Sequence, residues 1–156
     1  MKKYQFLLIG FILILGLASC IEQEPFKDYV STNIVTEWID FEDADKYVHF
    51  DSFSETKTDI ISTYEDFKKY DFAFELEEGL FETKEVFIFS ATYCSTDRMG
   101  FIEILLKEGK LYPLYKRKKI GRNEPRTDDF RISAHYVLLD KEDHYEAGNI
   151  LFDYFK

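Results

Sequence analysis

Cysteine and histidine are the residue types in this chain that could combine into a nucleophilic site. Cys94 ends an apolar run, and the sequence supplies His49, His135 and His144. A histidine beside a cysteine lowers the thiol pKa and provides a base, as a thiol hydrolase requires. None of these histidines lies in a hydrolase signature. We therefore expect a core thiol and no enzyme, with a Cys94-dependent hydrolase as an alternative.

Two acidic clusters offer oxygen ligands of the kind that calcium prefers. They are residues 42–45 (Glu-Asp-Ala-Asp) and the pair Asp128 and Asp129. Neither cluster has the ligand spacing or the glycine of an EF-hand loop. Turn chemistry and a solvated surface explain both clusters, so we expect no metal site and no cofactor.

A basic segment lies within an otherwise acidic protein. Seven basic residues and one acid fall between positions 110 and 126, whereas the whole chain has 30 acidic and 20 basic residues and a net charge of −10. Such a segment is attracted to anionic lipid by about 1 kcal/mol per charge. It could equally dock an acidic partner, or form a solvated hairpin rim. The candidate binding residues are Lys116, Arg117, Lys118, Lys119 and Arg122.

The first residues have the pattern of a secretory signal. Lys2 and Lys3 precede residues 6–17, a run without a polar side chain. In a helix this run spans about 18 Å, short of the roughly 30 Å hydrocarbon core of a bilayer, so we expect cleavage. Residues 17–20, Leu-Ala-Ser-Cys, resemble the bacterial lipobox. The resemblance implies that Cys20 is diacylated and becomes the first mature residue, and two or more acyl chains anchor a protein firmly.

These predictions divide the chain into three parts. We expect a lipoprotein signal peptide over residues 1–19, the lipidated cysteine and a polar tether over residues 20–33, and one globular domain over residues 34–156. The expected location is the extracytoplasmic side of a plasma or outer membrane.

Removal of the signal peptide makes the protein more acidic. It leaves 18 basic and 30 acidic residues, a net charge of −12. An acidic domain is a poor ligand for nucleic acid, so we expect no nucleic-acid partner. With Cys20 lipidated, Cys94 is the one remaining thiol, and no intramolecular disulfide can form.

The elements that must position these residues are mainly strands. Residues 84–94 are apolar on both faces, which predicts a central strand covered on both sides. Pro113 cannot donate a backbone hydrogen bond, which predicts an edge or bulged strand. Residues 107–110 predict a hairpin turn, and residues 116–126 a polar loop. The predicted strands span residues 34–41, 47–53, 84–94, 100–106, 111–115, 130–139 and 150–155, with an acidic turn between the first two.

One short helix is predicted over residues 63–70. Ser62 and Glu65 have the spacing of a capping box, and Tyr64, Phe67 and Tyr70 recur on one face. Residues 76–81 could add a turn. The fold class is therefore α+β, with a mainly antiparallel sheet of about seven strands, curled into a barrel or stacked as a sandwich.

The order of these elements from residue 61 to residue 139 resembles the PrcB-type domain, the C-terminal domain of a protease-complex lipoprotein subunit. The likeness lies in the helix start at residues 61–67, the strand at residues 86–89 and the late strand at residues 132–139. The family usually has a Gly-Gly pair where residues 94–100 read Cys-Ser-Thr-Asp-Arg-Met-Gly. The resemblance implies an accessory, protein-binding role without catalytic residues.

The expected function is that of a lipid-anchored, non-enzymatic domain that binds or supports another envelope protein. A lipoprotein that binds a small ligand or serves a structural role is an alternative.

Overall fold

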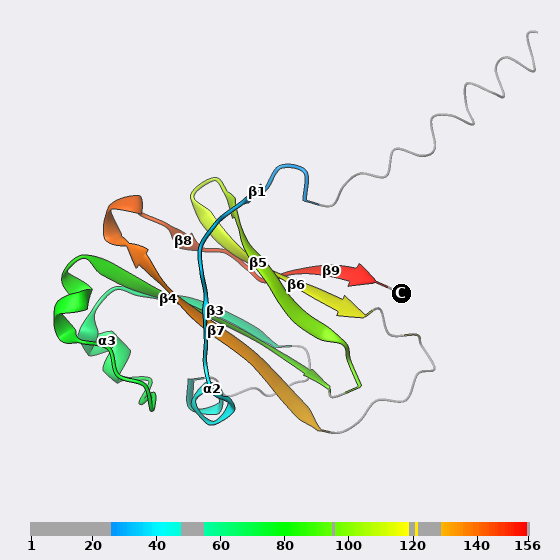
Figure 1. The fold of residues 1–156 in the computed structure, drawn as a ribbon, viewed down its shortest axis with the longest axis horizontal. Coiled ribbons are helices and arrows are strands. Elements are labelled where there is room, and N and C mark those ends of the chain that lie inside the picture. Colours follow the sequence, from blue (N-terminus) through cyan, green and yellow to red (C-terminus); the bar gives the residue numbers. More distant parts are fainter. Residues whose placement is uncertain (1–25, 48–54, 95, 119–120, 122–128, 156) are drawn as a thin grey trace, which may run out of the picture.

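The structure is a computed structural model that describes residues 26–47, 55–94, 96–118, 121 and 129–155. Within these ranges it is mostly β-structure with a few short helices, which confirms the predicted α+β class (Figure 1). The strands form two sheets, most of whose pairs are antiparallel, and do not close into a barrel. No helix in the described ranges is long and apolar enough to cross a membrane.

The first sheet has the order β2-β7-β4-β3, and all its strand pairs are antiparallel. The central strand β4 pairs with β7 along its whole length and with β3 on its other side. Val86 and Ile88 face one way, Phe87 and Phe89 the other, and all four are fully buried. The prediction of a doubly covered central strand is confirmed. The strands are β2 (Glu37–Trp38), β7 (Phe130–Asp140), β4 (Lys84–Cys94) and β3 (Thr56–Ile61).

The second sheet has the order β1-β5-β6-β8, and β9 also pairs with β6. β5 and β6 form the predicted hairpin, and Glu108 and Gly109 take the positive φ values that a two-residue turn requires. β8 and β9 run parallel to β6, so this sheet is mixed. Its strands are β1 (Val30–Ser31), β5 (Met99–Lys107), β6 (Lys110–Lys118), β8 (Glu146–Ala147) and β9 (Leu151–Phe155).

Pro113 does not mark a sheet edge, contrary to the prediction. β6 is an inner strand, with β5 on one side and β8 and β9 on the other. β8 pairs with β6 at Lys110 and Leu111, and β9 resumes the pairing at Leu114. Pro113 therefore falls in the gap between the two parallel pairings, where its missing donor interrupts no ladder. The irregularity is on β5 instead, between Phe101 and Glu103.

The two faces of β4 separate two cores, and the molecule has three layers. The inner core lies between the sheets, where the Tyr115 hydroxyl of β6 donates to the Ser133 carbonyl of β7 at 3.2 Å. The helix-side core lies between the β4 sheet and the short helices α2 (Phe41–Tyr47), α3 (Tyr64–Lys68) and η1 (Glu78–Glu82). It includes Ile39, Ala44, Ile61, Phe67 and Phe81.

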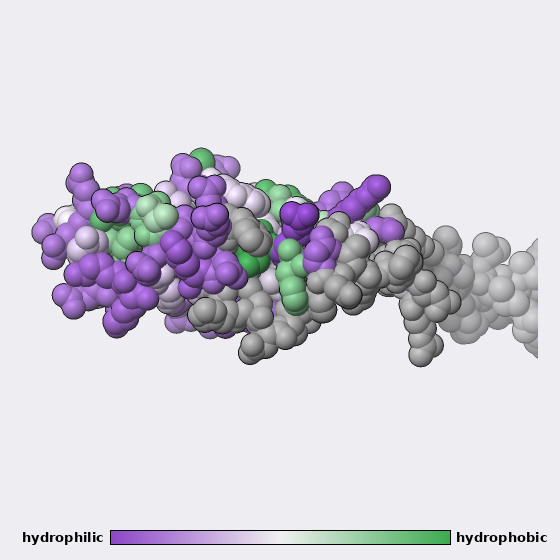
Figure 2. Space-filling view, turned by 90° about the horizontal axis from the view of Figure 1, so that it is seen from below, coloured by the Kyte–Doolittle hydropathy of each residue, from purple (hydrophilic) through white to green (hydrophobic). Residues whose placement is uncertain are grey.

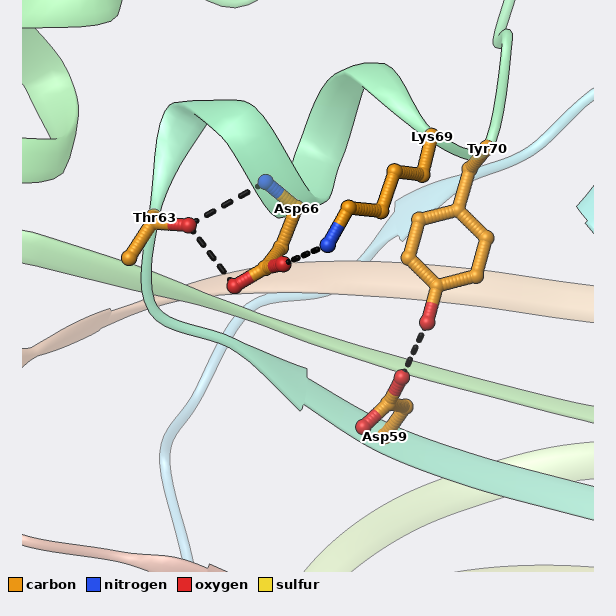
Figure 3. Close-up of polar contacts among 5 residues, drawn as sticks. All are labelled: Asp59, Thr63, Asp66, Lys69 and Tyr70. Carbon is orange, nitrogen blue, oxygen red and sulfur yellow. Dashed lines mark hydrogen bonds and ion pairs between the residues drawn. The ribbon is translucent and has the colours of Figure 1, made fainter.

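Helix α3 is present as predicted, but its cap lies one residue later. The Thr63 side chain accepts the Asp66 amide at 3.1 Å (Figure 3). Ser62 instead donates to the Glu85 carboxylate at 2.7 Å and so ties the start of the helix to β4. The predicted pairing of Ser62 with Glu65 is therefore wrong, because a tertiary partner takes the Ser62 hydroxyl.

An aromatic layer covers the helix side of the β4 sheet. The Tyr70 hydroxyl donates to Asp59 of β3, which fastens the end of α3 to the sheet (Figure 3). Burial, together with the nearby Asp59 carboxylate, raises the pKa of Tyr47 and of Tyr70, so both phenols stay protonated at neutral pH. The successive rings of Tyr70, Phe72, Phe74 and Tyr136 stack at centroid distances of 5.6, 4.7 and 4.9 Å.

The predicted strand over residues 34–41 is wrong apart from Glu37 and Trp38. The acidic stretch predicted as a turn is helix α2, with Glu42 and Asp43 in its first turn and Lys46 in its last. Acidic residues in the first turn and a lysine in the last turn interact favourably with the helix dipole. The prediction of a turn considered only strand propensity and not this effect. Tyr47 ends α2, and the rest of the predicted strand 47–53 lies outside the described residues. β3 was not predicted.

The strap, residues 29–39, joins the edges of the two sheets. β1 pairs with β5, and β2 pairs with β7. In Figure 1 the strap is the blue to cyan trace that runs from β1 to α2. After β1 the Thr32 amide donates to the Ile104 carbonyl, and after β2 the Ile39 amide donates to the Ala134 carbonyl, both at 3.1 Å. Ile34 packs against the inner core. Residues 29–32, which fall in the predicted tether, therefore lie against the sheet.

Replacement of Gly148 tests the link between β8 and β9. Its amide donates to the Leu111 carbonyl at 2.9 Å, and an added Cβ would lie 2.7 Å from the Tyr112 ring and 2.9 Å from that same carbonyl oxygen. We expect Gly148→Ala to lower the free energy of unfolding by about 1–3 kcal/mol, measured by urea denaturation. Gly79→Ala is the control, because a Cβ there meets open space. Equal midpoints for both variants would contradict the close packing at Gly148.

Candidate partner-binding groove

An open groove of about 580 Å³ lies where β4 ends and β5 begins. Gly100 of β5 pairs with Lys116 of β6, and β9 pairs with the same end of β6 through Phe155. The register of three strands therefore brings together residues that are far apart in the sequence. The groove is lined by Tyr93, Arg98, Gly100, Ile102, Lys116 and Phe155, among others.

The predicted basic loop is partly a strand. β6 continues through Lys116, Arg117 and Lys118, so these residues are held by a ladder and alternate between the two faces of the sheet. Lys119 and Arg122 lie outside the described residues. The structure thus assigns different roles to neighbouring cations.

Arg117 is a structural residue. Its Nη2 lies 3.0 Å from Asp97 Oδ2, and the side chains of Arg117 and Asp97 are only 13% and 1% exposed. The guanidinium also lies over the Phe152 ring, 5.5 Å from its centroid. The second carboxylate oxygen of Asp97 is buried and has no hydrogen-bond partner among the described residues, so Arg117 is the described group that compensates this charge. Arg117 is therefore not available to a partner.

Lys116 and Arg98 are the exposed cations at the groove. Lys116 Nζ lies 5.5 Å from the centroid of the Phe155 ring. Both residues are exposed, and within the described ranges no ion pair reaches either of them. Beside them Ile102 is 44% exposed. Positive charge and accessible apolar surface therefore occur together here.

Arg98, Gly100, Ile102 and Phe155 were not predicted as site residues. No motif or spacing in the sequence groups these four residues. The register of the β5–β6 hairpin brings Gly100 and its neighbours to Lys116, whereas Phe155 reaches Lys116 through the parallel pairing of β9 with β6, which local patterns do not reveal.

The structure does not bring Cys94 together with either described histidine. Cys94 is buried and pairs with Phe130, whereas His135 lies five residues further along β7, about 17 Å away. His144 follows η2 (Lys141–Asp143), at the opposite end of β4. His49 lies outside the described residues.

The acidic clusters serve structural contacts where they are described. Asp43 accepts the Ala73 amide at 3.0 Å and lies 3.6 Å from Lys46. Asp129 lies 3.8 Å from Arg131. Within the described part of the chain, no three histidine, cysteine or acidic side chains are placed to hold a metal ion.

Exposed hydrophobic side chains are scattered over the face seen in Figure 2. Hydrophilic residues dominate its described surface, and hydrophobic groups form small separate patches. Scattered apolar residues do not by themselves mark an interface. The groove differs from these patches because it combines exposed cations with apolar surface.

Removal of Arg117 should destabilise the fold, whereas removal of Lys116 should not. Arg117→Ala leaves the buried Asp97 carboxylate uncompensated, which should cost about 3 kcal/mol of unfolding free energy. Lys116→Ala removes an exposed charge and should change stability by less than about 0.5 kcal/mol. Urea denaturation of both variants measures the difference. Equal losses would contradict the separate roles of these residues.

His135 should make the fold sensitive to mild acid. Its ring stacks on Phe89 at 5.4 Å, and burial lowers its pKa to about 4. Since the unfolded histidine titrates near pH 6.5, the unfolded state binds the extra proton between about pH 6.5 and pH 4, and stability falls over that window. In the wild type we expect the free energy of unfolding to fall by about 2 kcal/mol more between pH 7.5 and pH 4 than it does in His135→Phe, which lacks the titrating group.

The His135 experiment has a matched control in His144, which is exposed. His144→Gln should keep the full pH dependence of the unfolding free energy. A His135→Phe protein with the same pH dependence as the wild type would contradict the assignment to His135.

Comparison with known proteins places the chain in no group. It matches no protein-family model, no curated protein and no solved structure. The resemblance to the PrcB-type domain therefore stays a prediction.

Proposed function

We propose that the protein is a lipid-anchored domain on the extracytoplasmic side of a bacterial membrane that binds or supports another envelope protein without catalysis. The groove between the ends of β5, β6 and β9 is the contact surface. The observation that carries this proposal is the pairing of exposed Arg98 and Lys116 with accessible apolar surface in an acidic protein.

The chemistry of the groove supports a macromolecular partner. Interfaces combine apolar contact area with arginine and charged groups at the rim, and complementary charge improves association rate and specificity. The groove is open to solvent, whereas small-molecule sites enclose most of the ligand surface. A protein surface fits this shape better than a small ligand does.

The anchor is supported by residues 17–20 and the apolar run before them. A lipidated Cys20 would keep the domain close to its membrane and raise its effective concentration near other envelope proteins. The separation of Cys94 from His135 supports a non-catalytic role.

Affinity purification of the lipidated protein from its own membranes, after mild crosslinking, tests this function. We expect one dominant envelope protein by mass spectrometry, and a roughly tenfold loss of that protein with Lys116→Glu, because charge reversal opposes an acidic partner. Lys57→Glu is the matched control, since Lys57 is an exposed lysine on β3 that does not line the groove.

Two further results bear on the proposal. Cys20→Ser should abolish acylation and release the protein from the membrane fraction. If Lys116→Glu captures the same partners as the wild type, the groove is not the contact surface. If Cys20 of the native protein is not acylated, the proposed lipid anchor is wrong.

A further inference from the structure

We infer that the groove faces away from the bilayer and accepts an extended acidic segment of the partner protein, which lies across Gly100 beside β5. This inference rests on the proposed function, because it assumes the anchor at Cys20. It adds the orientation of the domain and the chemistry of the bound segment.

The chain enters the sandwich at the hairpin between β5 and β6. β1 is antiparallel to β5, with Val30 opposite Leu106, so the residues before position 30 leave the sheet at the hairpin end (Figure 1). Asp28 lies 3.9 Å from Lys107, and the Tyr29 ring lies 5.1 Å from the Tyr112 ring. These contacts hold the entry point against the hairpin.

The remaining tether is short. Six positions separate Cys20 from Phe26, the first described residue, and they span at most about 20 Å. Gly100 lies six positions before Leu106 on β5, which places the groove about 20 Å beyond the entry point, in the direction away from the tether. The anchor therefore holds the hairpin end near the lipid and presents the groove to proteins.

The charge of the groove selects an acidic occupant. Asp97 is the carboxylate among the lining residues, and Arg117 already neutralises it. Arg98 and Lys116 remain as exposed cations in a chain whose net charge is −10. A segment with carboxylates at alternate positions could meet both cations from one face.

The backbone of β5 favours an extended occupant. Among the described residues, β6 is the one strand that pairs with Met99 and Gly100, because β1 pairs with β5 at Leu105 and Leu106 and the backbone bond from Thr32 extends this contact only to Ile104. An unpaired strand edge can accept an added strand through backbone hydrogen bonds. A Cβ at Gly100 would meet nothing within 4 Å, so the side chains of a segment paired beside β5 have room to lie over this position, and a valine there would fill that room. Ile102 and Phe155 offer apolar contacts beside this space.

Occupation of the space above Gly100 tests the inference. The lipidated full chain is placed in phosphatidylcholine nanodiscs, and binding of a fluorescent peptide of alternating glutamate and phenylalanine is measured by anisotropy. We expect Gly100→Val and Lys116→Glu each to weaken binding by roughly tenfold or more. Gly79→Val is the matched control, because a Cβ at Gly79 also meets open space, and it should bind like the wild type. A peptide of alternating lysine and phenylalanine should not bind.

The outcomes separate the inference from the proposed function. Equal affinity of the wild type and Gly100→Val, or no binding of the acidic peptide, overturns the inference. Binding to added phosphatidylglycerol vesicles that is lost in Gly100→Val also overturns it, in favour of a lipid occupant. A cellular partner whose capture is unaffected by Gly100→Val leaves the proposed function standing without the inference. Failure of the chain to enter nanodiscs instead removes the anchor.

Discussion

The central strand β4 has no solvent-facing side, and the rest of the structure follows from that constraint. Four consecutive residues, Val86 to Phe89, have no exposed surface. Each buried side chain of this size contributes about 1.5–3 kcal/mol, so neither face can be left to water. The second sheet covers the phenylalanine face, and the aromatic layer with its short helices covers the aliphatic face. The molecule therefore has three layers because both faces of β4 must be covered.

The strap provides a second constraint, because a sandwich of two sheets has open edges. One short segment adds an edge strand to each sheet and places Ile34 against the inner core between them. The strap also determines where the chain leaves the domain. Because the strap pairs with both sheets, it also determines the end of the domain at which a membrane anchor on Cys20 would be attached.

The groove shows how alternation along a strand separates two similar residues. Arg117 and Lys116 are neighbours in β6, yet one is buried against Asp97 and the other is exposed. Buried charges persist in proteins when they are paired, so Arg117 belongs to the fold. Lys116, on the opposite face, can serve binding without a cost to stability. A count of basic residues does not distinguish these two residues. They differ because successive side chains of a strand point to opposite faces of the sheet.

Local physics in the sequence determined β4, the hairpin at Glu108 and Gly109, and the existence of α3, because each depends on an apolar pattern or a turn conformation within a few residues. The acidic character and the candidate Cys20 anchor also follow from sequence alone. Tertiary structure decided the rest. Helix α2 occupies a stretch predicted as a turn, and Pro113 lies between the pairings of β8 and β9 with β6. Ser62 donates to Glu85 of β4 and does not cap its own helix. Strand register between distant segments assembled the groove, since the contacts of Gly100, Lys116 and Phe155 do not exist until β5, β6 and β9 are paired.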